Sequence, residues 1–479
     1  MDLFHTALDY FAEISAVPRC SGAEERVRSF FCDWAVGQGY EYRIDRVGNL
    51  LIRVPASAGF ERKDTIILQG HMDMVCEKNE GSNHDFSKDP IRLFTEGDWL
   101  KARGTTLGAD NGIGLAIAMA VAVDKEAIRP PLELLFTVDE ETGLTGASAL
   151  TPDFFSGRIL INLDSEDEGV FTVGCAGGRD SEIILPIEHE PAPGDSTFIS
   201  IKVQGLAGGH SGVDINQQRA NAIVVLAQLL NGLAGEMEFL LASISGGSAH
   251  NAIPREARVV LAISGPAEVA GEEIKRLAES VRGSYPNEPG LAITCENLSS
   301  LPKAVYAKAS SAATCKLLAA SPHGVIAMSA EVPGLVETSV NLATIREKEG
   351  GVALLFSQRS DREEGLRLVA AKLEDLSERA GASITTSTGY PGWRPDFNSE
   401  LLSRSKGVYR KLFDREPKVE VIHAGLECGL IGAVAPEMDM ISLGPTIENP
   451  HSPRERLHIP SVERIIRFLT TLLSAFCRE

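Results

Sequence analysis

Histidine and acidic side chains follow apolar runs of this sequence that have the character of buried strands. His71 ends one such run, the acid pair Glu140 and Glu141 follows a second, and Asp164 follows a third. Ligand sites in open α/β sheets form beyond the ends of strands. The recurrence of these side chains therefore predicts one site that is assembled from several strands. Read alone, each of them is also compatible with a structural role, such as a buried histidine or an exposed acidic loop.

Two further residues extend this set. Asp110 stands in the sequence GADNG before an apolar helix, where a lone aspartate would ordinarily be a helix cap. His451 stands in the loop sequence NPHSP. Imidazole nitrogen and carboxylate oxygen are ligands of zinc, and a carboxylate with two oxygens can bridge two cations. These residue types suit a dinuclear hydrolase, which needs acids on the metals and a free acid that accepts a proton from water.

Asp73 follows His71 by two residues. In an extended chain, residues two apart point to the same side. The Asp73 carboxylate could therefore hydrogen-bond the second ring nitrogen of His71 and fix its tautomer, as the partners of metal-bound histidines commonly do.

The segments GHMDMVCEKN, GADNG, VDEETG, LDSE, GGHSG and ENPHSP occur in this order along the chain. Together they resemble the zinc peptidases related to aminoacylase and carboxypeptidase G, family M20, and within that family the bacterial dipeptidase branch. The resemblance covers the whole chain. It implies two Zn²⁺ ions per subunit, although Co²⁺ or Mn²⁺ also suit such ligands. It implies one ion bound by His71, Asp110 and Asp164, a second bound by Asp110, Glu141 and His451, and a cis peptide bond after Asp110.

The same resemblance implies roles for residues that do not bind metal. Glu140 is expected to be the catalytic base and acid, and Asp73 to orient His71. His210, in GGHSG, is expected to polarise the scissile carbonyl, and in dimeric relatives this histidine comes from the other subunit, so we expect a homodimer. Asn251 is expected to contact the substrate. Glu427 either anchors the substrate's ammonium group or is a structural acid. Arg359 and Arg394 are candidate partners of the substrate's carboxylate, because a guanidinium group pairs with a carboxylate through two hydrogen bonds.

The substrate class follows from the branch of the family. Carboxypeptidase and deacylase branches usually have glutamate where this chain has Asp164, which favours a dipeptidase of broad specificity that includes carnosine-like Xaa-His substrates. The alternatives within the family are an aminotripeptidase and an N-acyl amino-acid hydrolase. An alternative of another class is a non-catalytic metal- or peptide-binding protein on the same scaffold.

Strands alternate with helices in the first and last parts of the chain, which predicts an α/β fold. We expect a catalytic domain split between residues 1–180 and 391–479, with a mixed sheet flanked by helices. Residues 181–390 change character and predict an inserted α+β domain, which serves as a lid and in dimerisation.

Composition limits the binding partners and the cellular compartment that we expect for the protein. Its formal net charge of −20 disfavours nucleic-acid binding. No apolar run approaches the roughly 18 residues of a membrane span, and the first residues lack the basic and apolar pattern of a signal peptide. The eight cysteines are widely spaced without a C-x-x-C pair, so we expect reduced thiols and a cytoplasmic protein.

Overall fold

The computed structural model describes residues 2–194, 196–298, 302–330 and 332–478. The chain divides into two units: a first unit of Met1–Cys175, Trp393–Val421 and Leu426–Glu479, and a second unit of Ala176–Gly392 and Ile422–Gly425. The divisions at Cys175 and Gly392 stand beside the boundaries expected at 180 and 390. The return of Ile422–Gly425 to the second unit was not expected from the sequence.

The first unit is built on a mixed sheet that has eight strands among the described residues, in the order β1-β2-β6-β3-β7-β23-β8-β22. Strands β6, β3, β7 and β23 run parallel to one another, and β1, β2 and β8 pair antiparallel. The strands are β1 (Glu41–Ile44), β2 (Leu50–Val54), β3 (Ile66–His71), β6 (Leu132–Thr137), β7 (Ile159–Asn162), β8 (Val170–Cys175), β22 (Lys418–Ile422) and β23 (Asp439–Ser442). A small antiparallel sheet contains β4 (Leu93–Glu96), β5 (Trp99–Ala102), β24 (Ile447–Glu448) and β25 (Arg456–His458).

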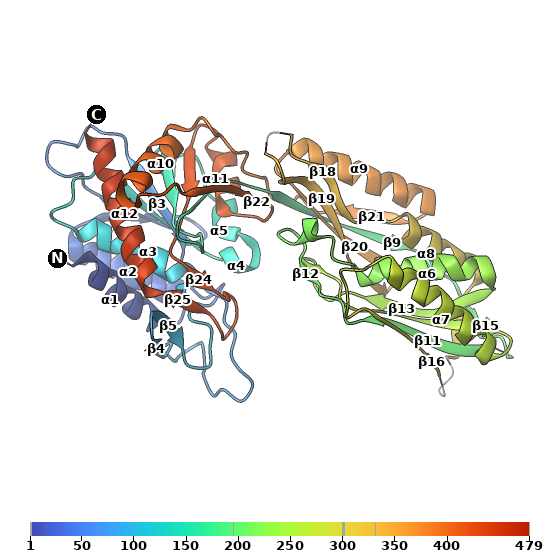
Figure 1. Ribbon diagram of the computed structural model, residues 1–479. Coiled ribbons are helices and arrows are strands. Elements are labelled where there is room, and N and C mark those ends of the chain that lie inside the picture. Colours follow the sequence, from blue (N-terminus) through green and yellow to red (C-terminus); the bar gives the residue numbers. More distant parts are fainter. Residues whose placement is uncertain (1, 195, 299–301, 331, 479) are drawn as a thin grey trace. The chain divides into compact units, whose positions relative to one another are not determined.

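The helices of the first unit form its main core with the sheet. They are α1 (Leu3–Ser15), α2 (Glu25–Gln38), α3 (Ala109–Val123), α4 (Glu140–Gly143), α5 (Thr145–Ser148), α10 (Glu400–Phe413), α11 (Glu427–Val434) and α12 (Ile459–Cys477). Helix α3 is apolar on all sides and buried along its length, because α1, α12 and the sheet all contact it. Figure 1 shows α1, α3 and α12 side by side in this unit. The predicted α/β fold class, a mixed sheet flanked by helices, is confirmed.

The second unit is an antiparallel sheet covered by helices. Its order is β16-β11-β15-β13-β19-β20-β9-β21, with β18 paired to β19. The strands of this sheet are β9 (Gly177–Leu185), β11 (Ser196–Gln204), β13 (Phe239–Gly246), β15 (Ala257–Ser264), β16 (Ala292–Asn297), β18 (Gly324–Met328), β19 (Val336–Lys348), β20 (Gly351–Ser360) and β21 (Ser383–Thr386). Helices α6 (Ala222–Glu236), α7 (Ala267–Gly283), α8 (Lys308–Ala320) and α9 (Glu363–Ala380) share one core with it (Figure 1).

Two short ribbons complete the second unit. Strand β10 (His189–Pro191) pairs with β17 (Ala304–Tyr306), and β12 (Gly209–His210) pairs with β14 (Ala252–Ile253). A 3₁₀ turn at Ile215–Gln217 follows β12. Within the described part of the whole chain, no helix combines the length and apolar character needed to cross a membrane.

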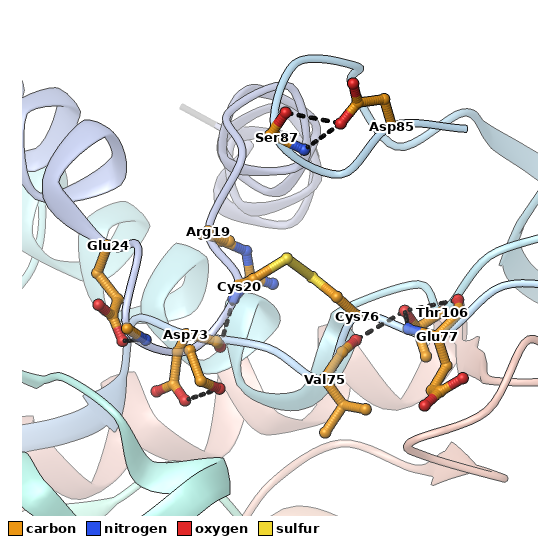
Figure 2. Close-up of a disulfide and its surroundings, with 12 residues drawn as sticks. Arg19, Cys20, Glu24, Asp73, Val75, Cys76, Glu77, Asp85, Ser87 and Thr106 are labelled. Atoms are coloured by element: carbon orange, nitrogen blue, oxygen red, sulfur yellow. Dashed lines mark hydrogen bonds between the residues drawn. A yellow bond between two sulfur atoms is a disulfide. The ribbon is translucent and has the colours of Figure 1, made fainter. Parts of the chain in front are cut away.

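One expectation about the cysteines is wrong, because Cys20 and Cys76 form a disulfide with their Cα atoms 5.7 Å apart. Figure 2 shows the disulfide between the two segments. The segments lie side by side, since Met74 N donates to Arg19 O at 3.1 Å and Cys20 forms a parallel bridge with Met74. The two cysteines are 56 positions apart in the sequence, so their spacing does not reveal that they are neighbours in the fold. Six cysteines are free thiols.

Candidate metal centre and active site

The central parallel strands bring the predicted residues to one edge of the sheet. In the β3–β6 pairing His71 is opposite Thr137, and in the β3–β7 pairing Gln69 is opposite Asn162. Because parallel strands end at the same edge, His71 lies beside the turn that follows Thr137. Asp164, two residues beyond Asn162, reaches the same place, with its Oδ1 atom 3.4 Å from His71 Nε2.

The turn after β6 separates three consecutive acids. Asp139 has φ of 52°, a left-handed conformation that is uncommon outside glycine. Its carboxylate accepts hydrogen bonds from the Thr142 and Thr145 hydroxyls. Glu140 and Glu141 begin α4, and their carboxylates both come within ligand distance of His71. The local backbone therefore directs Glu140 and Glu141 into the site, whereas the third acid, Asp139, is hydrogen-bonded to neighbouring threonines.

Asp73 holds both the histidine and the acid pair. Its Oδ1 atom lies 3.3 Å from His71 Nδ1, on the side of the ring that the spacing suggested, although the contact lacks hydrogen-bond geometry. The same carboxylate accepts the backbone N–H groups of Glu140 and Glu141 at 3.0 and 3.2 Å, and the Ser21 hydroxyl at 2.7 Å. Burial alone would raise the pKa of Asp73, but the close contact with His71, the charge of His71 and these donors lower it below its usual range.

Asp110 lies between the two histidines. Its Oδ1 is 3.0 Å from His71 Nε2, and its Oδ2 is 3.0 Å from His451 Nε2. The backbone at Asp110 and Asn111 departs from helical geometry, and the peptide bond between them is cis, as the resemblance implies. The side chain of Asn111 donates to Leu163 O at 2.7 Å, which ties the start of α3 to the segment that carries Asp164.

The predicted ligands form two sets that share Asp110. His71, Asp110 and Asp164 form one, and Asp110, Glu141 and His451 form the other, with the donor atoms of each set within 4.8 Å of one another. His451 Nε2 lies 3.1 Å from Glu141 Oε2. Zinc ligands at roughly 2.0–2.1 Å in a tetrahedron lie about 3.3 Å apart, so these separations fit. The described residues also place His71, Glu140 and Glu141 within the same limit.

The charges around the site also suit divalent cations. Buried Asp164 Oδ1 and Glu141 Oε1 have no hydrogen-bond partner among the described residues. Burial raises the pKa of Asp164 to about 7, and the charges of Asp110 and Glu141 act in the same direction. Hydrogen bonds to Asp110 and Glu141 raise the pKa of His451 to about 11. Without a metal ion, bound protons neutralise part of the acidic charge of this site. A divalent cation would neutralise more of this charge than a proton does.

Glu427 is fully buried beneath the site. Its Oε2 accepts hydrogen bonds from Gln69 Nε2 at 2.6 Å and from the Thr137 hydroxyl at 2.7 Å. Gln69 in turn accepts from Asn162 Nδ2 at 2.6 Å. Burial raises the pKa of Glu427 to about 7. Its Oε1 has no hydrogen-bond partner among the described residues. One oxygen of Glu427 therefore bonds strands β3 and β6, and the other makes no hydrogen bond to them.

The predicted substrate residues His210 and Asn251 lie next to each other in the second unit. Strands β12 and β14 pair His210 with Ala252, and Ser211 N donates to Asn251 O at 2.8 Å. His210 Nδ1 accepts the N–H groups of Gly212 and Val213 at 3.2 and 3.1 Å. Burial, together with the nearby Arg359 charge, lowers the pKa of His210 to about 4. The ring is therefore neutral, with its proton on Nε2.

The two candidate arginines differ in their surroundings. Arg359 is the second-last residue of β20, is 6 % exposed, and donates from Nη1 to Tyr390 Oη at 3.1 Å. Its Nε has no hydrogen-bond partner among the described residues. Arg394 is exposed and belongs to the first unit. Because a buried guanidinium with an uncommitted donor suits carboxylate binding, Arg359 is the stronger candidate.

Comparison with known proteins assigns the family. The family model for peptidases M20/M25/M40 matches residues 67–475, which include all five predicted metal ligands. The chain belongs to peptidase family M20/M25/M40. The cytosol non-specific dipeptidase of Escherichia coli K12 is 41 % identical to this M20 peptidase over 467 residues, 97 % of this chain and 96 % of the relative.

Two solved structures are similar to this chain over nearly its whole length. The crystal structure of aminoacylhistidine dipeptidase from Vibrio alginolyticus is 40 % identical, covers 98 % of this chain and 96 % of its own, and superposes with a TM-score of 0.87. Aminopeptidase PepT from Bacillus cereus, at 16 % identity, covers 99 % of both chains with a TM-score of 0.58 and shares the fold.

Two charged residues of this M20 peptidase carry no local sequence signal for a role at the site. Arg19 and Glu455 are 2 % and 3 % exposed, and both hydrogen-bond the backbone of the turn that leads into Asp110. Neither stands in an apolar run or beside a predicted ligand. Only the folded chain brings them to the turn.

Proposed function

We propose that this chain is a metal-dependent dipeptidase of broad specificity that accepts Xaa-His dipeptides. The observation that carries the proposal is the pair of ligand sets that share Asp110, in a chain 41 % identical to a dipeptidase along nearly its whole length. The ligands proposed for two Zn²⁺ ions, or for Co²⁺ or Mn²⁺, are His71, Asp110, Glu141, Asp164 and His451.

Glu140 is the residue that moves the proton in this proposal. Bound divalent cations would supply Lewis acidity that activates water and polarises the scissile carbonyl. Burial raises the pKa of Glu140 well above its usual value, and the nearby Asp164 and Glu427 charges add to this effect. Such a carboxylate holds a proton taken from water long enough to deliver it to the leaving amine. Asp73 fixes the Glu140 backbone while it does so.

The remaining proposed roles concern substrate recognition. His210, neutral with a donor Nε2, suits a hydrogen bond to the oxygen of the scissile carbonyl. Asn251 beside it is proposed as a polar contact, and Arg359 as the partner of the substrate's carboxylate. The uncommitted Oε1 of Glu427 is proposed to bind the substrate's ammonium group. This role requires movement at Glu427, because the side chain is fully buried.

We further propose a cytoplasmic homodimer that acts on small peptides. The cytoplasmic assignment is supported by the name of the Escherichia coli relative. The homodimer is an expectation from dimeric family members. Neither a nucleic acid nor a membrane is proposed as a partner, in keeping with the net charge of −20.

A substrate panel tests the proposal. The purified protein should hydrolyse dipeptides, lose activity to a chelator, and recover it with added Zn²⁺, Co²⁺ or Mn²⁺. Faster turnover of tripeptides or of N-acetyl amino acids would favour an aminotripeptidase or an N-acyl amino-acid hydrolase instead. Metal binding without hydrolysis of any of these compounds would favour the non-catalytic binding protein.

A further inference from the structure

The turn that carries Asp110 is held by a buried carboxylate from a distant part of the chain. Glu455 Oε2 accepts the N–H groups of Leu107 and Gly108 at 2.7 and 2.9 Å. Glu455 Oε1 accepts those of Ala109 and Asp110 at 2.8 and 3.3 Å. One carboxylate therefore satisfies four consecutive amides at the start of α3, where helix N–H groups have no intrahelical partner.

A buried guanidinium holds the same turn by its carbonyl. Arg19 Nη2 donates to Gly108 O, and Nη1 donates to Met72 O and Asp73 O at 3.0 and 2.7 Å. Gly108 is thus bound at both of its polar groups, its N–H by Glu455 and its C=O by Arg19. Figure 2 shows Arg19 beside the disulfide, near Asp73.

The glycines of the GADNG sequence leave room for this guanidinium. Gly108 has φ of 70°, and a Cβ atom there would come within 2.6 Å of Arg19 Nη2. A Cβ atom at Gly112 would approach the same nitrogen to 2.6 Å. The close packing of Arg19 against this turn therefore requires glycine on both sides of Asp110.

We propose that Glu455 and Arg19 are positioning residues that fix the Asp110 carboxylate between His71 and His451. Each connects the Asp110 turn to another ligand-bearing segment. Arg19 binds the carbonyl groups that follow His71, and Glu455 lies four residues after His451 in a loop closed by its own bond from Glu455 N to Ser452 O, 2.9 Å. The inference rests on the proposed function, because it assigns Asp110 to both metal ions.

The shared position of Asp110 gives the proposal a distinctive signature. Loss of the Glu455 carboxylate should weaken both metal ions together, since both depend on Asp110. Glu455→Gln keeps the shape of the side chain, but its NH₂ group faces two of the four amides and cannot accept from them. Residues that support metal ligands typically contribute 10–100-fold to metal affinity, so we expect a loss of roughly that size for both ions.

Glu133→Gln is the matched control. Glu133 is 1 % exposed on β6 and accepts the N–H groups of Ser156 and Gly157 at 2.8 and 3.0 Å. It stands two residues into β6, at the opposite end of the strand from Glu140. Its substitution removes a comparable buried carboxylate without touching the Asp110 turn, so metal affinity should stay at the wild-type value.

The experiment is calorimetric titration of chelator-treated protein with Zn²⁺ and with Mn²⁺, together with hydrogen exchange of the peptide that spans residues 105–112. Glu455→Gln should bind both ions 10–100-fold more weakly and exchange faster at this turn. Wild-type affinity for both ions in a Glu455→Gln protein with faster exchange would overturn the proposal. If that variant does not fold, Arg19→Lys decides the question by the same criteria, because lysine keeps the charge but cannot reach three carbonyls. Failure of the wild-type protein to bind either ion would instead contradict the proposed function, and this inference with it.

Discussion

Replacement of Glu140 by glutamine separates proton transfer from metal binding. Glu140 and Glu141 are adjacent and both lie within ligand distance of His71. If Asp110, Glu141 and His451 hold one ion and His71, Asp110 and Asp164 the other, then Glu140 binds neither. Glu140→Gln preserves the size of the side chain and the N–H group that donates to Asp73. It should therefore leave metal binding intact and remove only the group that exchanges protons.

The expected size of the effect follows from this role. A positioned general acid or base contributes about 10²–10⁴-fold to a rate, which is about 3–5 kcal/mol of activation free energy. The loss should appear in kcat, with the metal content unchanged. The free energy of unfolding of the metal-free protein, by contrast, should not fall in this variant. Burial raises the pKa of Glu140 in the folded protein, so ionisation of this group opposes folding increasingly as pH rises above the unfolded value of about 4.5.

Metal titration and steady-state kinetics on one preparation test this reasoning, with Glu141→Gln as the comparison. Glu141→Gln should lose affinity for an ion, whereas Glu140→Gln should bind two and lose at least 10²-fold in kcat. The metal-free Glu140→Gln protein should melt no lower than the metal-free wild type at pH 7–8. More than a tenth of wild-type turnover with both ions bound would refute the role of Glu140. Loss of one ion would show that Glu140 is a ligand.

Three further results are expected. The Cys20–Cys76 disulfide joins residues 56 positions apart, and closing a loop of this length stabilises the fold by up to about 4 kcal/mol in the chain-entropy model. Cys76→Ser should lower the thermal midpoint, and reductant should lower the wild-type midpoint but not that of the variant. The pKa of His451 is raised to about 11, and that of His71 is raised well above its usual value. Zn²⁺ binding at pH 7 should therefore release protons, which is measured as a calorimetric enthalpy that depends on the buffer, and the affinity for Zn²⁺ should rise with pH. His210→Ala should lower kcat by about 10²–10³-fold. It should leave the acid limb of the pH profile unchanged, because the His210 pKa of about 4 keeps the ring neutral in the assay range; a shift of that limb in the variant would contradict a neutral donor.

The local sequence could predict which residues meet because the fold uses a simple rule. His71 ends a strand of the parallel part of the sheet, Glu141 and Asp164 follow two others, and the registers of β3, β6 and β7 bring these strand ends together. Strand identity is encoded in runs of apolar residues, such as 66–68 and 134–136, that any fold of this class must bury. Asp110 and His451 needed the family resemblance, because a helix start and a loop do not reveal their neighbours.

Features that depend on long-range contacts were not accessible in this way. The partners of Glu455 are the backbone N–H groups of residues 107–110, which donate to its carboxylate because of their position in the fold and not because of their residue types. The Cys20–Cys76 bond needs Cys20 to lie beside Met74, a pairing that no periodicity encodes. The return of Ile422–Gly425 to the second unit likewise depends on packing around Tyr390, against which a Cβ atom at Gly425 would come within 2.8 Å.

Some buried acids at this site are proposed metal ligands, and others hydrogen-bond the backbone of the segments that carry those ligands. Asp73 accepts the amides of Glu140 and Glu141, and Glu455 accepts those of the Asp110 turn. Each places a negative charge where water is excluded. His71 and the hydrogen-bond donors more than offset this cost at Asp73, whose pKa is lowered, whereas burial outweighs the amide hydrogen bonds at Glu455 and raises its pKa. Burial accordingly raises the pKa of Asp164 to about 7, so part of the charge is held back by protons. Divalent cations would replace those protons and favour the folded state. Metal binding should therefore raise the free energy of unfolding of the first unit, because both depend on the same cluster of acidic charges.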